Sequence, residues 1–429
     1  MDPIQITIAA FVFILGACVG SFLNVVVYRL PRVDHPADGS YLRGAYLSFQ
    51  SLIHPPSTCP NCQTRLAAYD NVPIFGWLWL RGKCRYCRNP ISARYPIVEF
   101  ATAAVFLFHF LMLFAYGWGP YETKPVQDVF GMWVTQVRVP GIERDWPVLV
   151  LHLWLIGALI AASLIDLEHF IIPLEICWIT AIVGVFGHAF LIGENQLGSL
   201  HMGAPVDALT LGAGIGLLVS LGLLRKGIFK RSFESDAPLM EHELKDVPED
   251  QRPDPWPKSR IRQEMRREMI FLFPPIAFGA VAAALVMSVP AIGNAWANAS
   301  DQPIVSGALG SLFGALIGGA VVWFFRIAGS YGFGREAMGL GDVHLMFGVG
   351  AIIGGGASTV AFFLAPLFGL TIAILQLLTK GRREIPYGPY LSLATYAVLL
   401  FYTPIREYLA PGMEGLLWMF GNLIGNGAA

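Results

Sequence analysis

Charged residues are scarce in this chain. Only 14% of its 429 residues are Asp, Glu, Lys or Arg, whereas an ordinary soluble protein carries about 25%. The 29 basic and 30 acidic side chains nearly cancel, which gives a formal net charge of -1. No overall field would attract a polyanion, so we expect no nucleic-acid partner. With 55% hydrophobic residues, the composition excludes a water-soluble globule of this size.

The missing charges leave long uncharged stretches. Nine of them approach the roughly 20 residues that a helix needs to cross a bilayer. They are 3–28, 100–121, 146–165, 176–193, 208–224, 269–300, 302–325, 343–379 and 385–405. At about 1.5 Å per residue, the stretch 343–379 would be roughly 55 Å long, too long for one crossing. Its glycines at 354 to 356 and Pro366 predict a break. We therefore predict an all-α polytopic membrane protein with about ten crossings.

The basic residues are unevenly distributed between the predicted loops. Segments 29–94, 225–267, 326–335 and 380–383 hold nine, eleven, two and three of them, 25 of the 29. Because Lys and Arg accumulate on the cytoplasmic side, these segments are predicted to be cytoplasmic and both termini exterior. The parity holds only if 343–379 crosses twice.

The N-terminal stretch contains a possible processing site. Leu15-Gly16-Ala17-Cys18 is similar to a lipoprotein cleavage box, but Asp2 stands where a signal peptide has basic residues. The apolar run also continues through Val27. We expect residues 3–28 to form a retained first helix.

Four of the six cysteines form two CxxC pairs. The two pairs are separated by 21 residues, and their members are Cys59, Cys62, Cys84 and Cys87. Two such turns can surround one zinc ion with four thiolates, which leaves no open coordination position. The sequence therefore predicts a structural zinc that holds the cytoplasmic loop 31–97 together. A redox or disulfide role and unliganded thiols remain alternatives.

Two aspartates lie at predicted cytoplasmic ends of spans. Asp166 follows the stretch 146–165, and Asp342 closes the sequence Gly339-Leu340-Gly341-Asp342 before the broken stretch. A carboxylate that borders hydrocarbon is costly and is a functional candidate. The alternative is that each merely caps a helix or pairs with a neighbouring basic residue.

A pair of such carboxylates could hydrolyse a peptide bond. Two close carboxyl groups share one proton and titrate as a unit. The ionised member can take a proton from attacking water while the protonated one donates to the carbonyl oxygen. Gly339 and Gly341, which lack a Cβ, could admit an extended peptide as substrate-binding residues.

The motifs together resemble the type IV prepilin peptidases of the GxGD aspartyl protease group. Besides the two CxxC pairs they are GSFLNVVVYRLP at 20–31, YDNVP at 69–73, LRGKC at 80–84, PISARYPIVE at 90–99, ID at 165–166, IP at 172–173, GLGD at 339–342 and IPYGPY at 385–390. His344 departs from the pattern, because relatives usually have Lys there. The segments 119–147 and 225–268 are longer than the family suggests.

The resemblance implies a multi-pass enzyme of the bacterial inner membrane, in contact with lipid. It would cleave basic leaders from prepilins and pseudopilins of type IV pilus and type II secretion systems on the cytoplasmic side. Asp166 and Asp342 match the catalytic aspartates. Relatives with the cysteine loop also N-methylate the new terminus with S-adenosylmethionine, an activity that rests on resemblance alone.

The expected organisation follows from these assignments. It comprises a first helix (1–30), the zinc loop with the methyltransferase part (31–97), a bundle with Asp166 (98–224), a charged linker (225–268) with a short helix near 260–268, a bundle with the GLGD motif (269–411) and a tail (412–429). The rival functions are a methyltransferase or assembly scaffold without proteolysis, and a polytopic transporter with boundary carboxylates.

Overall fold

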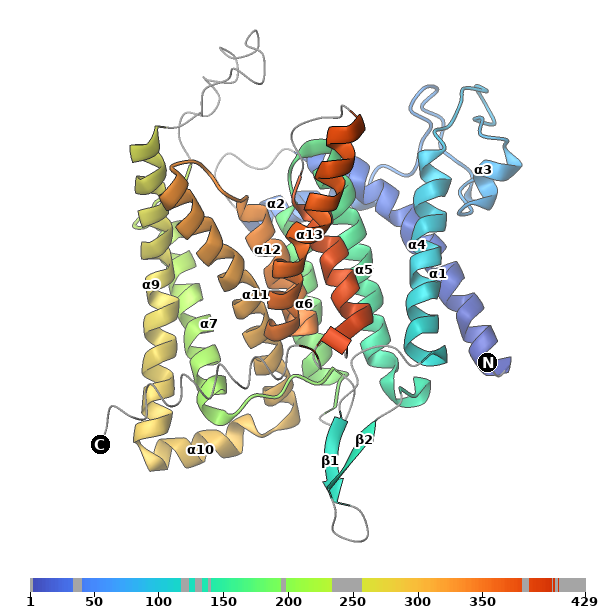
Figure 1. Ribbon diagram of the computed structural model, residues 1–429. Helices are drawn as coiled ribbons and strands as arrows, with labels where there is room; N and C mark the ends of the chain where they lie inside the picture. The colour runs from blue at the N-terminus through green and yellow to red at the C-terminus, as the bar shows by residue number, and fades with distance from the viewer. Residues whose placement is uncertain are drawn as a thin grey trace. The chain divides into compact units, whose positions relative to one another are not determined.

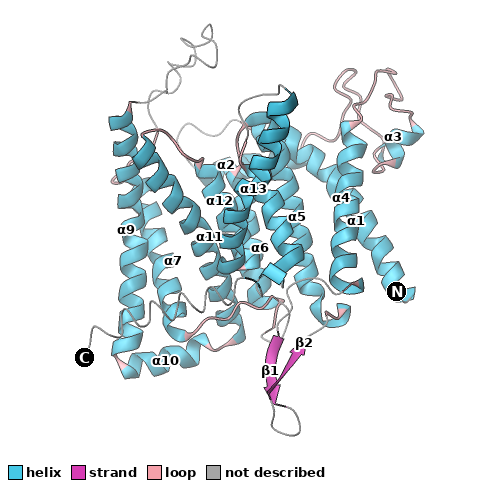
Figure 2. Ribbon diagram, in the orientation of Figure 1, coloured by secondary structure: helices cyan, strands magenta, loops and turns pink. Residues whose placement is uncertain are grey.

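Helices dominate the part of the chain that the computed structural model describes (Figure 2). Described are residues 3–33, 41–116, 123–127, 133–137, 140–193, 198–233, 257–379, 386–402, 404–405 and 408. The predicted tail 412–429 and most of the linker 225–268 lie outside these ranges.

Seven helices are long and apolar enough to cross a membrane. They are α1 (Pro3–Arg29), α4 (Arg94–Phe110), α5 (Ile142–His169), α7 (Ala204–Arg225), α9 (Lys258–Ser288), α11 (Pro303–Phe333) and α13 (Gly355–Thr379), labelled in Figure 1. Three shorter apolar helices are α6 (Leu174–Phe190), α12 (Leu340–Ile353) and Gly388–Tyr402. Each of the ten predicted crossings thus contains an apolar helix. The predicted helical fold, with apolar helices of membrane-spanning length, is confirmed, whereas the number of crossings stays a prediction.

The long stretch 343–379 is broken at the predicted glycines. Helix α12 ends at Ile353, Gly354 adopts a positive φ of 83°, and α13 begins at Gly355. A positive φ is accessible to glycine at little cost, which explains the position of the break. Pro366 lies inside α13 and does not interrupt it.

Two strands correct the all-α prediction. Strands β1 (Thr123–Gln127) and β2 (Trp133–Val137) pair antiparallel, with Thr123 opposite Val137 and Gln127 opposite Trp133. They lie in the long segment 119–147, and β2 carries the strand-favouring sequence WVTQV. Each strand has only five residues, and a hairpin of this size does not produce an uncharged stretch of span length.

The stretch 269–300 also differs from the prediction of one span. Helix α9 begins at Lys258, so the expected short helix near 260–268 is its first part. Pro290 then starts the separate helix α10 (Pro290–Ser300). Proline has no amide hydrogen to continue α9 but is well suited to a first helical turn.

The chain forms two compact units. Unit one comprises Met1–Ile176, Gln196–Gly198 and Val360–Ala429, and unit two comprises Cys177–Asn195 and Ser199–Thr359. In unit one, α1 packs closely on α4 (Figure 1). A Cβ on Gly16 would lie 2.7 Å from the Ala103 Cα, and one on Gly20 would lie 2.7 Å from the Glu99 Cα. Small residues at these positions let the two backbones approach.

The segment between α1 and α4 contains little regular structure. It holds the 3-10 turn Leu30–Arg32, α2 (Tyr41–Ile53), the 3-10 turn Ala68–Asp70 and α3 (Phe75–Trp79). A short π-helical turn, Leu111–Ala115, continues α4 at its other end. Among its described residues, the segment buries few apolar side chains, namely Leu30, Cys59 and Cys84, so other contacts must hold it.

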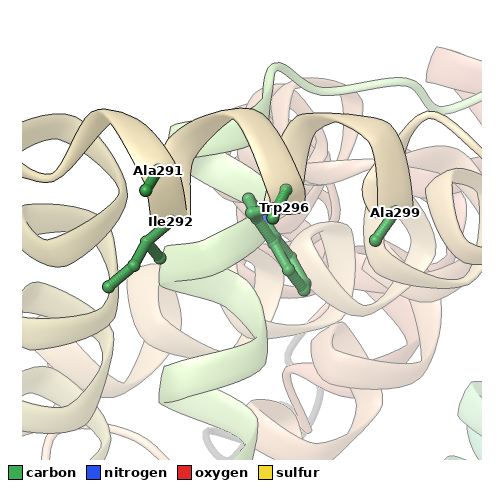
Figure 3. Close-up of a pocket in the computed structure, with 5 residues that line it drawn as sticks. Ala291, Ile292, Trp296 and Ala299 are labelled. Carbon is green, nitrogen blue, oxygen red and sulfur yellow. The ribbon is translucent and has the colours of Figure 1, made fainter.

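In unit two, α7 packs on α9, and α11 packs on α12. The second pair is so close that a Cβ on Gly314 would lie 2.1 Å from the Gly350 carbonyl oxygen. Figure 3 shows one face of α10, where Ile292 and Trp296 line an apolar pocket with three alanines. The Trp296 indole donates to the Ala204 carbonyl oxygen over 2.7 Å, which fixes α10 to the start of α7.

Candidate functional site

The four cysteines of the CxxC pairs meet in one cluster. Their Sγ atoms all lie within 4.8 Å of one another. The Sγ atoms of Cys59 and Cys87 are 3.8 Å apart, which matches the edge of about 3.8 Å of a tetrahedron with Zn–S bonds of about 2.3 Å. All four thiols are free, which argues against the disulfide alternative. The cluster could hold a metal ion, and its donor set fits zinc.

The two CxxC turns have the same backbone conformation. In each, the first cysteine donates its amide to the carbonyl five residues on, and its own carbonyl accepts from the amide four residues on. The distances are 3.0 and 2.9 Å for Cys59 with Thr64 and Gln63, and 2.9 and 3.0 Å for Cys84 with Asn89 and Arg88. Gln63 and Arg88 both have positive φ, 55° and 60°. Each turn therefore aims its two sulfurs in the same way.

Local hydrogen bonds separate the acidities of the thiols. The hydroxyl and amide of Thr64 lower the pKa of Cys62 to about 6. The amides of Cys87 and Tyr86 lower the pKa of Cys84. For Cys87, the Asn89 amide acts in the same direction, but burial and the neighbouring sulfurs outweigh it and raise the pKa to about 11. Thiolates bind metal, so the turns favour the binding form of Cys62 and Cys84.

An ion pair between the half-exposed Arg85 and the buried Asp70 joins the second turn to the YDNVP motif. The Arg85 Nε lies 3.1 and 2.8 Å from the two carboxylate oxygens of Asp70, and its Nη2 also donates to this carboxylate. The guanidinium lies over the Tyr69 ring, 5.1 Å from its centre. Arg85 lowers the pKa of Asp70, so the pair persists at neutral pH. The motif therefore has a structural role in the loop.

Two further contacts fix the loop to the helices of unit one. The Ile74 amide donates to the Glu99 carboxylate on α4 over 2.6 Å. The Asn24 side chain on α1 donates to the Tyr95 carbonyl over 3.2 Å. Glu99 and Asn24 both belong to the quoted motifs. Their side chains hold the loop at the ends of α1 and α4.

Asp166 lies near the C-terminal end of α5 and is 6% exposed. Its Oδ2 accepts a hydrogen bond of 2.9 Å from the amide of Gly388. That amide opens the helix Gly388–Tyr402, so the carboxylate faces the positive end of a helix dipole. A Cβ on residue 388 would lie 2.6 Å from the same oxygen. Asp166 does cap a helix, and only glycine at 388 permits this contact.

Glu168, the acid two residues after Asp166, has a different partner. Glu168 forms an ion pair with Arg94, the first residue of α4. Both side chains are partly exposed, 38% and 41%. This pair stays at the surface of unit one, whereas Asp166 is buried.

Asp342 occupies the first turn of α12, which Gly339 precedes as the N-cap residue. The side chain of Asp342 is buried, at 6% exposure. A Cβ built on Gly339 would contact its Oδ2 at 3.4 Å. The carboxylate thus turns back over the exposed backbone of the GLGD motif. Gly341 lies within this same turn.

Asp166 belongs to unit one and Asp342 to unit two. Their pairing therefore stays a prediction, as do the substrate roles of Gly339 and Gly341. The α10 pocket contains none of the predicted site residues.

Two residues of these sites are not predicted from the sequence. Gly388 was quoted only as part of the IPYGPY motif, although a glycine between two prolines is a signal for a close backbone contact. Arg326 was counted as a loop residue for orientation, but it lies inside α11 and is 1% exposed. Its sequence neighbours are apolar, and that could have marked it as a paired, buried charge.

The comparisons with known proteins agree with the motifs. Residues 14–113 match the family model of the bacterial peptidase A24 N-terminal domain. A prepilin leader peptidase/N-methyltransferase of Myxococcus xanthus is 36% identical over 47% of this chain and 46% of that protein. One of Aeromonas hydrophila is 24% identical over 93% of this chain and 92% of that protein. No solved structure matches.

A third relative has a differently worded name. The type 4 prepilin-like proteins leader peptide-processing enzyme of Escherichia coli is 36% identical over 37% of this chain and 48% of that protein. The chain thus spans about half the length of the Myxococcus xanthus and Escherichia coli relatives and nearly all of the Aeromonas hydrophila relative. The resemblance predicted from the motifs is confirmed: the chain is similar to prepilin leader peptidase/N-methyltransferases, over nearly its whole length in one case, and its residues 14–113 match the bacterial peptidase A24 N-terminal domain.

Proposed function

We propose that this chain is an aspartyl endopeptidase of the bacterial inner membrane that removes the leaders of prepilins or pseudopilins. The observation that carries the proposal is the placement of Asp166 and Asp342. Each is a buried carboxylate at the end of an apolar helix, and each lies against a helix N-terminus. Exposed surface acids would not be placed in this way. The names of the relatives support the substrate class.

The chemistry would proceed without a covalent intermediate. The ionised aspartate takes a proton from a water molecule, whose oxygen attacks the carbonyl carbon of the scissile bond. The protonated aspartate donates to the carbonyl oxygen, and the resulting tetrahedral species collapses with a proton passing to the leaving amine. Asp166 is held by the Gly388 amide, and Asp342 is held in the first turn of α12.

The side of the membrane follows from the charges. The basic segments are cytoplasmic by the distribution of Lys and Arg, and Asp166 and Asp342 lie at the helix ends on that side. A prepilin would present its basic leader there while its apolar segment remains in lipid. The proposed reaction involves no nucleic-acid partner.

We assign a second activity, N-methylation of the new terminus, to the same chain. The names of the relatives support it. S-adenosylmethionine would supply the methyl group. The loop between α1 and α4 is the candidate region, because it is the main folded segment outside the helices that carry the aspartates.

The metal in that loop is proposed to be zinc. Four thiolates satisfy zinc completely, and the four Sγ atoms here lie within 4.8 Å of one another. The ion would then hold the loop together and would not activate water. This assignment explains how a segment with few buried apolar residues keeps its conformation.

The zinc assignment can be checked by metal analysis. We expect about one zinc per chain in the purified protein and a loss of this metal in Cys84→Ser, because three thiolates leave the shell incomplete. Limited proteolysis should then cut the loop between α2 and α4. Cys18→Ser is the matched control, since Cys18 lies on α1 and should not affect metal content. Full zinc in Cys84→Ser would contradict the assignment.

One assay separates the proposed function from its rivals. Purified protein is incubated with a prepilin and labelled S-adenosylmethionine, and the products are weighed by mass spectrometry. We expect a shortened pilin that carries one added methyl group. A shortened, unmethylated product would reject the second activity only. Intact prepilin would reject the peptidase and leave the scaffold or the transporter.

A further inference from the structure

Unit two contains a fully buried arginine close to the GLGD motif. Arg326 lies in α11 and is 1% exposed. A guanidinium is not buried without partners, because removing its charge from water is costly. Its hydrogen bonds therefore indicate what the residue holds in place.

One side of the guanidinium is fixed to α9. The Arg326 Nε lies 3.2 Å from both carboxylate oxygens of Glu268, and its Nη2 lies 3.1 Å from Oε1. The Trp323 indole, one turn earlier on α11, donates to Glu268 Oε2 over 2.8 Å. The Glu268 carboxylate is thus held by two side chains of α11. This contact makes Arg326 part of a rigid helix pair.

The other side of the guanidinium reaches the loop between α11 and α12. Nη1 donates to the Glu336 carboxylate over 2.6 Å and also to the Met338 carbonyl oxygen. The same loop is fixed at Ala337, whose amide donates to the Ser330 hydroxyl over 2.9 Å. Its start is a glycine C-cap, because Gly334 has a φ of 71°. The loop is therefore held at three successive residues, from Glu336 to Met338.

The held residues lead directly into the first turn of α12. Met338 precedes Gly339, the N-cap residue, and Asp342 lies three residues further on. Any displacement of the Met338 carbonyl would move the N-cap and with it the carboxylate of Asp342. A bidentate guanidinium can hold three acceptors in a fixed plane, which the single ammonium of lysine cannot do.

We propose that Arg326 is a positioning residue for Asp342, which fixes the GLGD turn to the α9–α11 pair through Glu336 and the Met338 carbonyl. The inference rests on the proposed function, since it assigns a role in peptide cleavage. Arg326 does not touch the substrate in this scheme. It acts on the rate of the chemical step through the placement of one carboxylate.

The first test measures cleavage kinetics in purified variants. Arg326→Met should lower kcat by roughly 100-fold with little change in KM, because a displacement of about 1 Å at the reacting groups can cost that much. Arg326→Lys should recover part of the loss, since it keeps the charge but not all three contacts. Glu336→Gln should give a smaller loss of kcat. It is also the replacement test if Arg326→Met does not fold.

Arg267→Met is the matched control. Arg267 lies on α9 and donates over 2.7 and 2.8 Å to Glu264, a carboxylate that is 0% exposed. The substitution Arg267→Met therefore breaks an ion pair on the same helix, and this pair does not reach the GLGD loop. Its kcat should stay near that of the unsubstituted protein. Equal losses of kcat in the Arg326 and Arg267 variants would overturn the inference.

Hydrogen exchange tests the same inference without reference to activity. The amides of residues 337–342 should exchange faster in Arg326→Met than in the unsubstituted protein, and not faster in Arg267→Met. Unchanged exchange across this turn would reject the positioning role even if the enzyme cleaves prepilin. Conversely, a protein that leaves prepilin intact would reject the proposed function, while faster exchange would still support the structural contact.

Discussion

Replacing either Asp166 or Asp342 by Asn is expected to lower the rate of leader cleavage by roughly 1,000-fold or more, because general acid and base groups each contribute about 10²–10⁴-fold. The amide is nearly the same size as the carboxylate but can neither accept the proton of the attacking water nor donate one as an acid. The protein should still insert into the membrane. Cleavage of a prepilin, followed by mass spectrometry or gel shift, measures the effect.

Matched controls exist for both substitutions. Glu168→Gln changes an acid two residues from Asp166 that is engaged in a surface pair with Arg94. Asp301→Asn changes an exposed acid that follows α10. Both controls should process prepilin at nearly the normal rate. If Asp166→Asn and Asp342→Asn also do so, the aspartyl mechanism is wrong.

Substituting Gly388 by Ala is expected to reduce cleavage by roughly 100-fold, since small misplacements of reacting groups have effects of this size. The new Cβ would lie 2.6 Å from Asp166 Oδ2 and 3.2 Å from the Ile172 Cδ1 atom. The first separation is shorter than any normal contact, so the carboxylate or the helix Gly388–Tyr402 must move. The loss should appear in kcat.

Gly369→Ala is the control for this substitution. Gly369 also lies in unit one, in α13, but a Cβ there would meet only the Tyr390 ring, at an ordinary 3.6 Å. Activity should therefore be retained, and thermal stability should change little. Equal activity in Gly388→Ala and Gly369→Ala would show that the Gly388 amide does not matter for Asp166.

The sequence predicted features that depend on composition and local pattern. Uncharged stretches of about span length located ten apolar helices, seven of them long enough to cross a bilayer. The three glycines located the break at Gly354, because few other residues adopt its φ of 83°. The spacing of the cysteines predicted their cluster, because each CxxC turn is a local structure.

Other features depend on contacts between distant residues and could not be read in this way. The amide of Gly388 meets Asp166 across 222 positions, and Arg326 meets Glu268 across 58. The spacing of hydrophobic residues along the sequence does not indicate which distant residues make such a contact. The hairpin of β1 and β2 and the helix α10 were missed for another reason. Both elements are short, whereas the helices were predicted from uncharged stretches of span length.

The contact between Asp166 and Gly388 also sets an order on biosynthesis. Unit one takes its helices from both ends of the sequence, and α5 is made long before the helix Gly388–Tyr402. Until that later helix has entered the membrane, the Asp166 carboxylate lacks the amide donor that holds it. A nascent chain that ends before residue 386 would therefore carry both aspartates without a finished site. If the chain is the proposed endopeptidase, its activity would arise only late in translation, after the other described helices have been made.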